Sequence, residues 1–164
     1  MPTPVTDALH PGLRELRTRP LFAMQLNVRN PMPLIDTPGA GRRIAVITGG
    51  SFDGERLSGS VMDGGSDWLT VRPDGGATLD VRLVLLASDG AHIAMTYRGV
   101  RHGPPEALAR AGRGEPVDPS EIYFRSLVLF ETAAPQHAWL NHIVAVGAGQ
   151  RLAAGPVYSV FEVL

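Results

Sequence analysis

The chain has 164 residues, 44% of them apolar and 19% charged, and a formal net charge of −1. This length supports one domain with a sizeable core, and the near-neutral charge, with no basic cluster, argues against nucleic-acid binding. Cysteine and lysine are both absent, which excludes thiol nucleophiles, disulfides, thiolate metal sites, Schiff-base catalysis and the lysine of a phosphate-binding loop.

The first twenty residues are rich in proline and show no periodicity. They also lack the apolar core of a secretory signal, and no apolar run in the chain approaches the roughly 18–20 residues of a membrane span. We therefore expect a cytoplasmic protein without a membrane partner, with a poorly structured segment at 1–20 and one domain over 21–164.

Short β-type segments alternate with turn signals from residue 21 onward. The clearest is 78–87, in which the leucines and Val81 recur at every second position, as on one face of a pleated strand. The many glycines and prolines suit tight turns. The pattern favours an antiparallel sandwich or closed barrel, and we predict an all-β fold, an antiparallel β-barrel of roughly eight to ten strands with one short helix. We expect strands at 21–28, 42–48, 56–62, 67–72, 78–87, 91–98, 121–131, 138–147 and 156–164, and a helix at 104–112.

The expected strand 121–131 carries an unusual group of polar side chains. Glu121, Tyr123 and Arg125 share one face, which becomes apolar further along at Leu127 and Leu129. A wet outer face of a sheet would explain such residues one by one. The mouth of a ligand-binding barrel would explain them as a group.

Other expected strands also carry polar or aromatic side chains that could face solvent or line a ligand site. Trp139 and Asn141 share a face of 138–147, and Arg82 lies opposite the leucines of 78–87. Arg98 lies on a polar face of 91–98. Each of these side chains can orient a small ligand, so all four are candidates for binding a substrate.

The stretch DGGSDW combines a turn with the start of a strand. Residues 63–66 are typical of a hairpin turn, because glycine tolerates positive φ. Asp67 and Trp68 then point to opposite faces if the strand is regular. We favour Asp67 as the inward residue and keep Trp68 as a candidate wall residue.

Several chemistries find no support in the spacing of residues. His137 and His142 are five positions apart, which places them on opposite faces of a strand and argues against a shared metal. No G-x-S-x-G elbow and no complete dinucleotide glycine loop occur. We expect neither a metal nor a cofactor.

Several segments occur together in an order that resembles a known family. This combination resembles the uncharacterised bacterial and fungal family called domain of unknown function 3237, from about Leu21 onward. The segments are TGGSFDGERLSGSV (48–61), DGGSDWLTVRPDG (63–75), LDVRLVL (79–85), SDGAHI (88–93), YFRSLVLFET (123–132) and AWLNHIVAVG (138–147).

The resemblance implies a β-barrel, in agreement with the strand count, and is compatible with a homo-oligomer. Some members lie beside genes for natural products or aromatic catabolism, which implies a small organic molecule as partner. No general activity is settled for the family. The positions typical of the family that are present here are Asp67, Trp68, Arg82, Tyr123, Arg125, Trp139 and Asn141.

Our first hypothesis is a cofactor-independent enzyme that acts on an aromatic or polyketide-like molecule in a polar pocket of the barrel. Its chemistry would be that of an isomerase, cyclase, hydratase, dehydratase or lyase. Asp67 or Glu121 would be the base and Tyr123 the acid or oxyanion donor. Burial beside Trp68 would raise the pKa of Asp67 unless a nearby arginine lowers it.

The substrate-binding roles in this hypothesis follow from side-chain shape. Arg125 and Arg82 would bind a substrate oxygen in bidentate fashion, and Trp68 and Trp139 would stack on the substrate. The second hypothesis is a non-catalytic barrel that binds or carries a small ligand. A third is that the same polar residues form a buried network that only fixes the fold.

Overall fold

Alternation of buried and exposed side chains runs through the strands of the computed structural model, which describes residues 4–29 and 32–164. In β8 (Tyr123–Glu131) the alternation is strict, with every second side chain buried. The same period appears in β6 (Ala77–Ala87) and β7 (His92–His102). One face of each strand therefore faces an interior.

The elements of the described chain are as follows. The other strands are β1 (Thr18–Val28), β2 (Met32–Thr37), β3 (Ala40–Asp53), β4 (Gly59–Val61), β5 (Gly65–Val71), β9 (Ala145–Leu152) and β10 (Gly155–Val163). The helices are α1 (Val5–Ala8) and α2 (Pro105–Gly112), with 3-10 helices η1 (Pro11–Leu13) and η2 (Pro135–His142).

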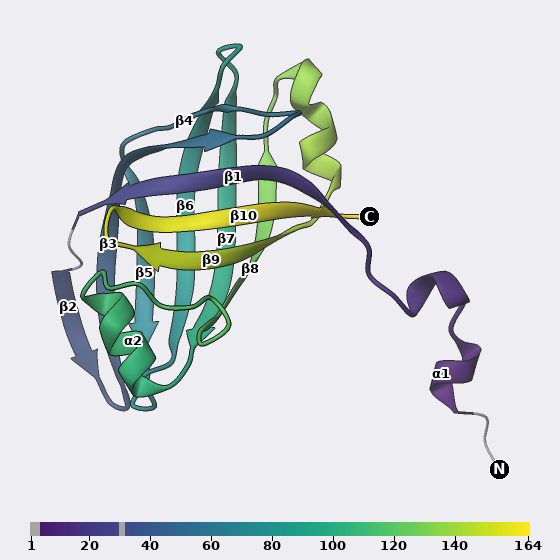
Figure 1. Ribbon diagram of the computed structural model, residues 1–164. Coiled ribbons are helices and arrows are strands. Elements are labelled where there is room, and N and C mark those ends of the chain that lie inside the picture. Colours follow the sequence, from purple (N-terminus) through teal and green to yellow (C-terminus); the bar gives the residue numbers. More distant parts are fainter. Residues whose placement is uncertain (1–3, 30–31) are drawn as a thin grey trace.

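The sheet closes on itself as an antiparallel barrel (Figure 1). Strand β1 pairs with β10 on one side and with β3 on the other. Eight strands form the ring in the order β1, β10, β9, β8, β7, β6, β5 and β3, with β2 and β4 as additional strands. The predicted all-β barrel is confirmed, and closure leaves no long unpaired edge in the ring.

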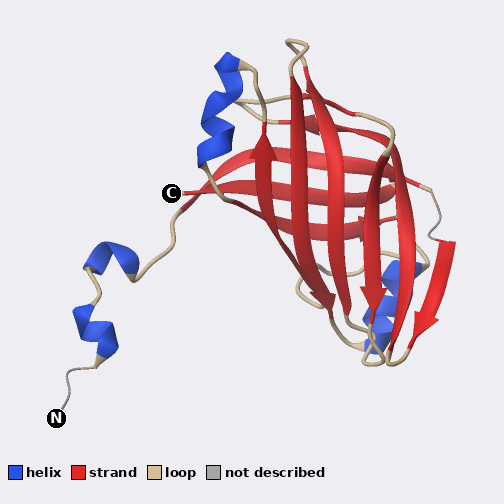
Figure 2. Cartoon of the chain, turned by 180° about the vertical axis from the view of Figure 1, so that it is seen from behind, coloured by secondary structure: helices blue, strands red, loops and turns tan. Residues whose placement is uncertain are grey.

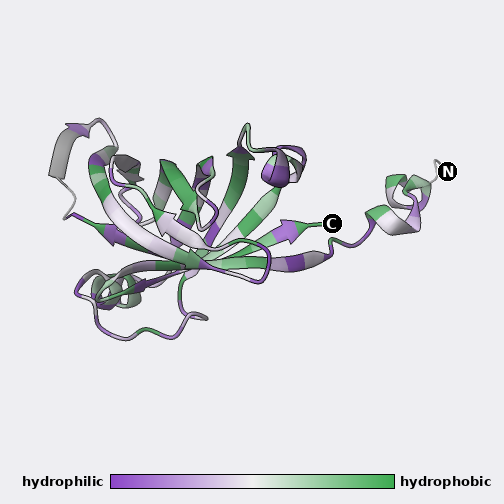
Figure 3. Ribbon diagram, turned by 90° about the horizontal axis from the view of Figure 1, so that it is seen from above, coloured by the Kyte–Doolittle hydropathy of each residue, from purple (hydrophilic) through white to green (hydrophobic). Residues whose placement is uncertain are grey.

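Aromatic and aliphatic side chains fill the half of the barrel nearest the β6–β7 hairpin. Phe22 packs against Phe52 and Phe130, with ring centroids 5.3 Å and 6.1 Å apart. Leu85 and Ile93 face each other across the hairpin and are fully buried. Figure 3 shows apolar residues recurring along the strands around the barrel. This packing leaves space only toward the opposite end.

The end opposite the hairpin is covered by α2, which starts with two prolines after β7. Pro105 lies in the first turn, where a missing N–H costs nothing. Ala107 and Ala111 are buried on its inner side together with Val117 from the segment that follows. The expected helix at 104–112 is thus present, and it forms a cap over the barrel.

Two segments differ from expectation. The expected strand 138–147 is wrong in its first half, because residues 135–142 form η2 and β9 starts only at Ala145. Pro135 at the start of η2 supplies a φ suited to a helical turn and cannot donate in a sheet. The segment between the expected strands 21–28 and 42–48, where no strand was predicted, contains β2, which pairs with β3.

The N-terminal segment 4–17 contains only α1 and η1, and neither helix buries a residue. Figure 1 shows this segment extending away from the barrel. Regular pairing starts at Thr18, which is opposite Val163 of β10. None of the helices in the described ranges is long and apolar enough to cross a membrane.

Candidate functional site

A cavity of about 420 Å³ lies inside the barrel beneath α2. This volume lies within the usual range for small-molecule sites. Its wall is made by residues of all eight ring strands, and α2 and the segment that follows close one side. The apolar part of the wall includes Leu26, Ile47, Leu69, Leu79, Phe124 and Pro156.

Asp67 brings a carboxylate into this apolar cavity. It follows the turn at 63–64, where Gly64 adopts a φ of 104°, and lies on the inward face of β5. One of its oxygens accepts a hydrogen bond of 3.1 Å from the Asp80 backbone N–H.

Burial raises the pKa of Asp67 to about 6. The Asp80 backbone N–H and the charge of Arg101 oppose this rise, and the Asp80 carboxylate adds to it. The rise follows from burial in the cavity wall, because Trp68 points away from Asp67 and is 50% exposed. Near neutral pH the carboxylate is therefore ionised but still basic.

Two tyrosines line the cavity beside Asp67. The Tyr97 and Tyr158 ring centroids are 5.4 Å apart, and Tyr158 is also 5.4 Å from Phe124 with the rings edge to face. Burial raises the pKa of both phenols well above the usual range, and the Asp67 charge adds to the effect. Both tyrosines therefore remain protonated and can donate hydrogen bonds to a ligand oxygen.

Two arginines complete the polar part of the cavity. Arg101 is on β7 and Arg151 is on β9. The Arg101 Nε is buried and has no hydrogen-bond partner, while its Cζ is 5.9 Å from the Phe124 ring centroid. Within residues 4–29 and 32–164, neither arginine forms an ion pair within 4 Å. A buried donor without a partner is costly, so this pair of arginines favours an anionic ligand.

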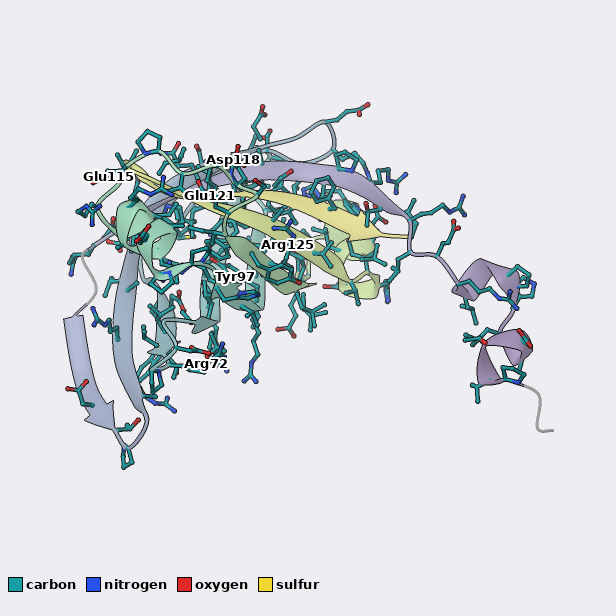
Figure 4. All side chains as sticks on the ribbon, turned by 60° about the horizontal axis from the view of Figure 1, so that its bottom comes forward. Arg72, Tyr97, Glu115, Asp118, Glu121 and Arg125 are labelled. Carbon is teal, nitrogen blue, oxygen red and sulfur yellow. The ribbon has the colours of Figure 1, made fainter. Side chains whose placement is uncertain are left out.

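Burial lowers the pKa of the Arg101 guanidinium, and the nearby charge of Arg151 lowers it further. Tyr158 and Asp67 act in the opposite direction. A guanidinium still keeps its charge near neutral pH. The cavity thus combines two fixed positive groups, two phenolic donors and one carboxylate that titrates near pH 6. Figure 4 labels Tyr97 among them and shows Glu115 and Asp118 on the segment after α2.

Four of the predicted site residues gather on the outside of the barrel instead. Trp68, Arg98, Tyr123 and Arg125 line a wide, open groove on the outer face of β5 to β8. Arg82 is exposed on the same outer face. The expectation that they share a pocket with Asp67 is wrong in geometry, because the face of β8 that turns inward carries Phe124, and Tyr123 is 51% exposed.

Contacts within the outer groove are local. Arg98 pairs with Asp80 at 3.5 Å, and Tyr123 stacks on His102 with ring centroids 5.2 Å apart. The Arg125 guanidinium donates to the Phe124 carbonyl at 2.9 Å and lies 5.3 Å from the Tyr123 ring centroid. Exposed contacts of this kind contribute little to stability.

The remaining predicted residues have structural contacts. Glu121 lies in the turn before β8 and forms an ion pair of 2.6 Å with Arg110 of α2. Trp139 lies in η2 under the guanidinium of Arg56, whose Cζ is 3.8 Å from the ring. The Asn141 side chain accepts from the Thr132 N–H at 2.8 Å and donates to the Thr132 carbonyl at 2.9 Å.

Sequence reasoning missed Tyr97, Tyr158, Arg101 and Arg151. A signal was available for Arg101, since it continues the inward parity of Ile93, Met95 and Tyr97 on β7. A charged residue at the end of an otherwise apolar face indicates a buried polar site. Arg151 lay outside every expected strand.

No metal cluster is apparent in the part of the chain that the structure describes, where no three histidine, aspartate or glutamate side chains come together. The fold and the cavity define a closed antiparallel β-barrel with an interior site of small-molecule size. Comparison with known proteins makes this more specific. The chain belongs to the family described as "Protein of unknown function (DUF3237)", whose model matches residues 16–163, and the resemblance seen in the sequence is confirmed.

Relatives in this family share the fold. The chain is 41% identical over 123 residues to the UPF0311 protein RPA1785 of Rhodopseudomonas palustris, covering 75% of this chain and 80% of that protein. The crystal structure of RPA1785, a conserved protein of unknown function, superposes with a TM-score of 0.87 at 35% identity and covers 92% of this chain and 99% of that one.

Two further solved structures extend the comparison. A β-barrel-like protein of Acinetobacter baumannii has a TM-score of 0.77 at 35% identity, covering 92% of this chain and 97% of that one. A protein of Penicillium herquei described as an enzyme has a TM-score of 0.70 at 21% identity, covering 91% and 95%. At that identity the likeness concerns the fold alone.

Proposed function

We propose that this protein is a cofactor-independent enzyme that binds a small organic acid or phenol beneath α2 and removes a proton from it with Asp67. One observation carries the proposal: a carboxylate with a pKa of about 6 faces an apolar cavity of about 420 Å³. A general base acts best when its pKa lies near the working pH, and such a base typically contributes a factor of about 10²–10⁴ in rate.

The other polar groups of the cavity suit the charge that such a step creates. When the Asp67 carboxylate takes a proton from a carbon next to a carbonyl group, the electron pair moves to the carbonyl oxygen as an enolate; when it takes the proton of a phenol, the pair stays on the phenol oxygen. The Arg101 guanidinium and the hydroxyls of Tyr97 and Tyr158 line the same cavity and can donate to that oxygen. The phenyl ring of Phe124 offers an apolar surface for an aromatic ring.

The reaction class depends on what the substrate anion does after it has lost its proton to Asp67. Return to another carbon gives an isomerisation, and attack by the new anion within the substrate gives a cyclisation. Loss of a leaving group gives a lyase or dehydratase reaction, and hydration is its reverse. The P. herquei protein described as an enzyme supports the idea that a barrel of this fold can hold a catalytic site.

The alternative is a non-catalytic barrel that binds or carries a small anionic ligand. It is favoured by Arg101 and Arg151, which can hold a carboxylate without any reacting group. The Asp67 oxygen that accepts from the Asp80 N–H is also already engaged. Glu121, Tyr123 and Arg125 lie outside the cavity and have no part in either form of the proposal.

Hydrogen–deuterium exchange separates the two. The protein is incubated in D2O with aromatic acids and polyketide-type phenols, and loss of substrate C–H signals is followed by NMR while calorimetry measures affinity. Asp67→Asn should slow exchange by about 100-fold or more and change affinity only a few-fold. Glu121→Gln, which removes a carboxylate outside the cavity, is the matched control and should leave both unchanged.

Two other results of this exchange experiment would argue against the proposed enzyme. Binding without exchange of any ligand supports the carrier. Exchange that is as fast in Asp67→Asn as in the wild type shows that Asp67 is not the base.

A further inference from the structure

The outer face of β5 to β8 is apolar at its centre and is not covered by another element in the described part of the chain (Figure 2). Leu127 and Leu129 in the middle of β8 are 52% and 50% exposed, and Trp68 and Tyr123 are about half exposed. Exposed apolar area of this kind, mixed with arginine and aromatic residues, is typical of protein–protein interfaces. It lies on the opposite side of the sheet from the cavity.

The strand register gives this face an internal symmetry. One row of inward residues crosses these four strands in the order Asp67, Val81, Tyr97 and Val128. Outward residues lie in rows on either side of this row. A two-fold axis along this row, in the plane of the interface, would place the face of a second copy against the first. Each strand would then lie against the same strand of the other copy, and residues on one side of the row would face residues on the other side.

The charges on the face are complementary under this rotation. Residues 80 and 82 are equally far from Val81, so Asp80 of one copy would face Arg82 of the other. Residues 125 and 131 are equally far from Val128, so Arg125 would face Glu131. Each of these contacts would bring a negative and a positive side chain together. The first contact is between two copies of β6 and the second is between two copies of β8.

The apolar residues match under the same rotation. Leu127 would face Leu129 of the second copy, and Val100, opposite Arg125 in the register, would face Ala94, opposite Glu131. Arg98 would face Thr96 and so would not oppose another charge. A two-fold interface requires such self-complementarity of a single patch, and no like-charged pair arises in the central rows.

We propose that the protein forms a two-fold symmetric dimer through the outer face of β5 to β8, with the axis along the row of Val81, Tyr97 and Val128. Four strands spaced about 4.8 Å apart and about nine residues long give a patch of roughly 570 Å². This is smaller than the roughly 800 Å² per partner of a standard interface and is typical of a weak one. Sheet twist confines the contact to the central rows, so we expect dissociation in the micromolar range.

Charge reversal tests the axis directly. The dimer should be present in sedimentation velocity at about 100 µM wild-type protein. Arg125→Glu and Glu131→Arg should each weaken dimerisation at least about tenfold, since each places like charges together. The double variant exchanges the two charges and should restore dimerisation to within a few-fold of the wild type. Circular dichroism and thermal unfolding check that each variant is folded.

An apolar site variant gives a second, independent arm. Leu127→Asp should abolish the dimer, whereas Leu13→Asp should leave it intact, because Leu13 is 73% exposed on the N-terminal segment. A wild-type protein that stays monomeric up to about 300 µM would overturn the proposal. A dimer insensitive to both single reversals, or a double reversal without recovery, would overturn it too.

Discussion

The interior cavity and the outer groove are built from the same kinds of residue, yet their physical settings differ. Inside, Asp67 and Arg101 lie among apolar side chains, and burial shifts both of their pKa values. Outside, Arg98 and Arg125 make local contacts in water. Trp68 belongs to the outer region although it is the direct neighbour of Asp67.

Residue type alone therefore does not define a site in a barrel. Adjacent residues of a strand point in opposite directions, one into the barrel interior and one into water. Only the interior has a low dielectric constant. Shifted pKa values and unpaired donors therefore mark the inner region. The outer region, which contains Trp68, Tyr123 and three of the predicted arginines, is the surface that we propose for association.

The largest expected difference between the regions is in stability. Tyr158→Ala removes a fully buried ring that contacts Tyr97 and Phe124, and should lower the free energy of unfolding by about 3–5 kcal/mol. Tyr123→Ala removes a half-exposed ring and should lower it by less than about 1 kcal/mol. Urea denaturation measures both. Equal losses would show that the outer tyrosine is also part of the core.

The pH dependence of stability comes next in size. Asp67 has a higher pKa in the folded protein, about 6, than the value of 3.8 expected in the unfolded chain. Its contribution to stability is therefore fully present below about pH 4 and is lost as the pH rises through about 6. Between these limits the loss amounts to about 2–3 kcal/mol.

Asp67→Asn removes this loss, because asparagine stays neutral. The difference in unfolding free energy between the variant and the wild type should thus grow by about 2–3 kcal/mol in favour of the variant from about pH 4 to 7. Asp63→Asn, in the exposed turn before β5, controls for the removal of an acidic residue. Parallel profiles for Asp67→Asn and the wild type would contradict burial of Asp67.

A smaller effect is expected for Asn141, which sequence reasoning assigned to substrate binding. Its side chain makes two hydrogen bonds to the backbone of Thr132, so Asn141→Ala should cost about 1–2 kcal/mol of stability. Affinity for a cavity ligand should not change. Thermal unfolding and calorimetry on the same sample give both values, and a loss of affinity at unchanged stability would favour the original assignment.

The smallest effect separates Trp68 from Asp67. Trp68→Ala should change stability by less than about 1 kcal/mol, because the side chain is half exposed. It should also leave the affinity of a cavity ligand within a factor of two or so. A tenfold loss of affinity in calorimetry would instead place the ligand in the outer groove.

The fold was predictable from the sequence because strand alternation and turn residues are local signals. The leucines of β6 and the helix at α2 appear as expected. The strand expected at 138–147 was not predictable in detail, because its apolar spacing fits a 3-10 helix as well. Only the packing of Leu140 into the core and the start of η2 at Pro135 decide between the two.

The site was predictable only in part. Parity separates Asp67 from Trp68, and the structure places Asp67 on the interior. Parity does not reveal which face of β8 turns inward, and there the polar face of Tyr123 and Arg125 is the outer one. The partners of Asp67 come from β7, β9 and β10, and their proximity depends on barrel closure, which no single segment encodes.

A crystal structure of the protein with a bound aromatic acid tests the central claim, that the interior cavity is the ligand site, most directly. We expect the ring against Phe124 and an anionic oxygen within hydrogen-bond distance of the Arg101 guanidinium, with Asp67 facing the ligand. An acid bound instead between Arg98 and Arg125 in the outer groove, with the cavity filled by side chains, would contradict it.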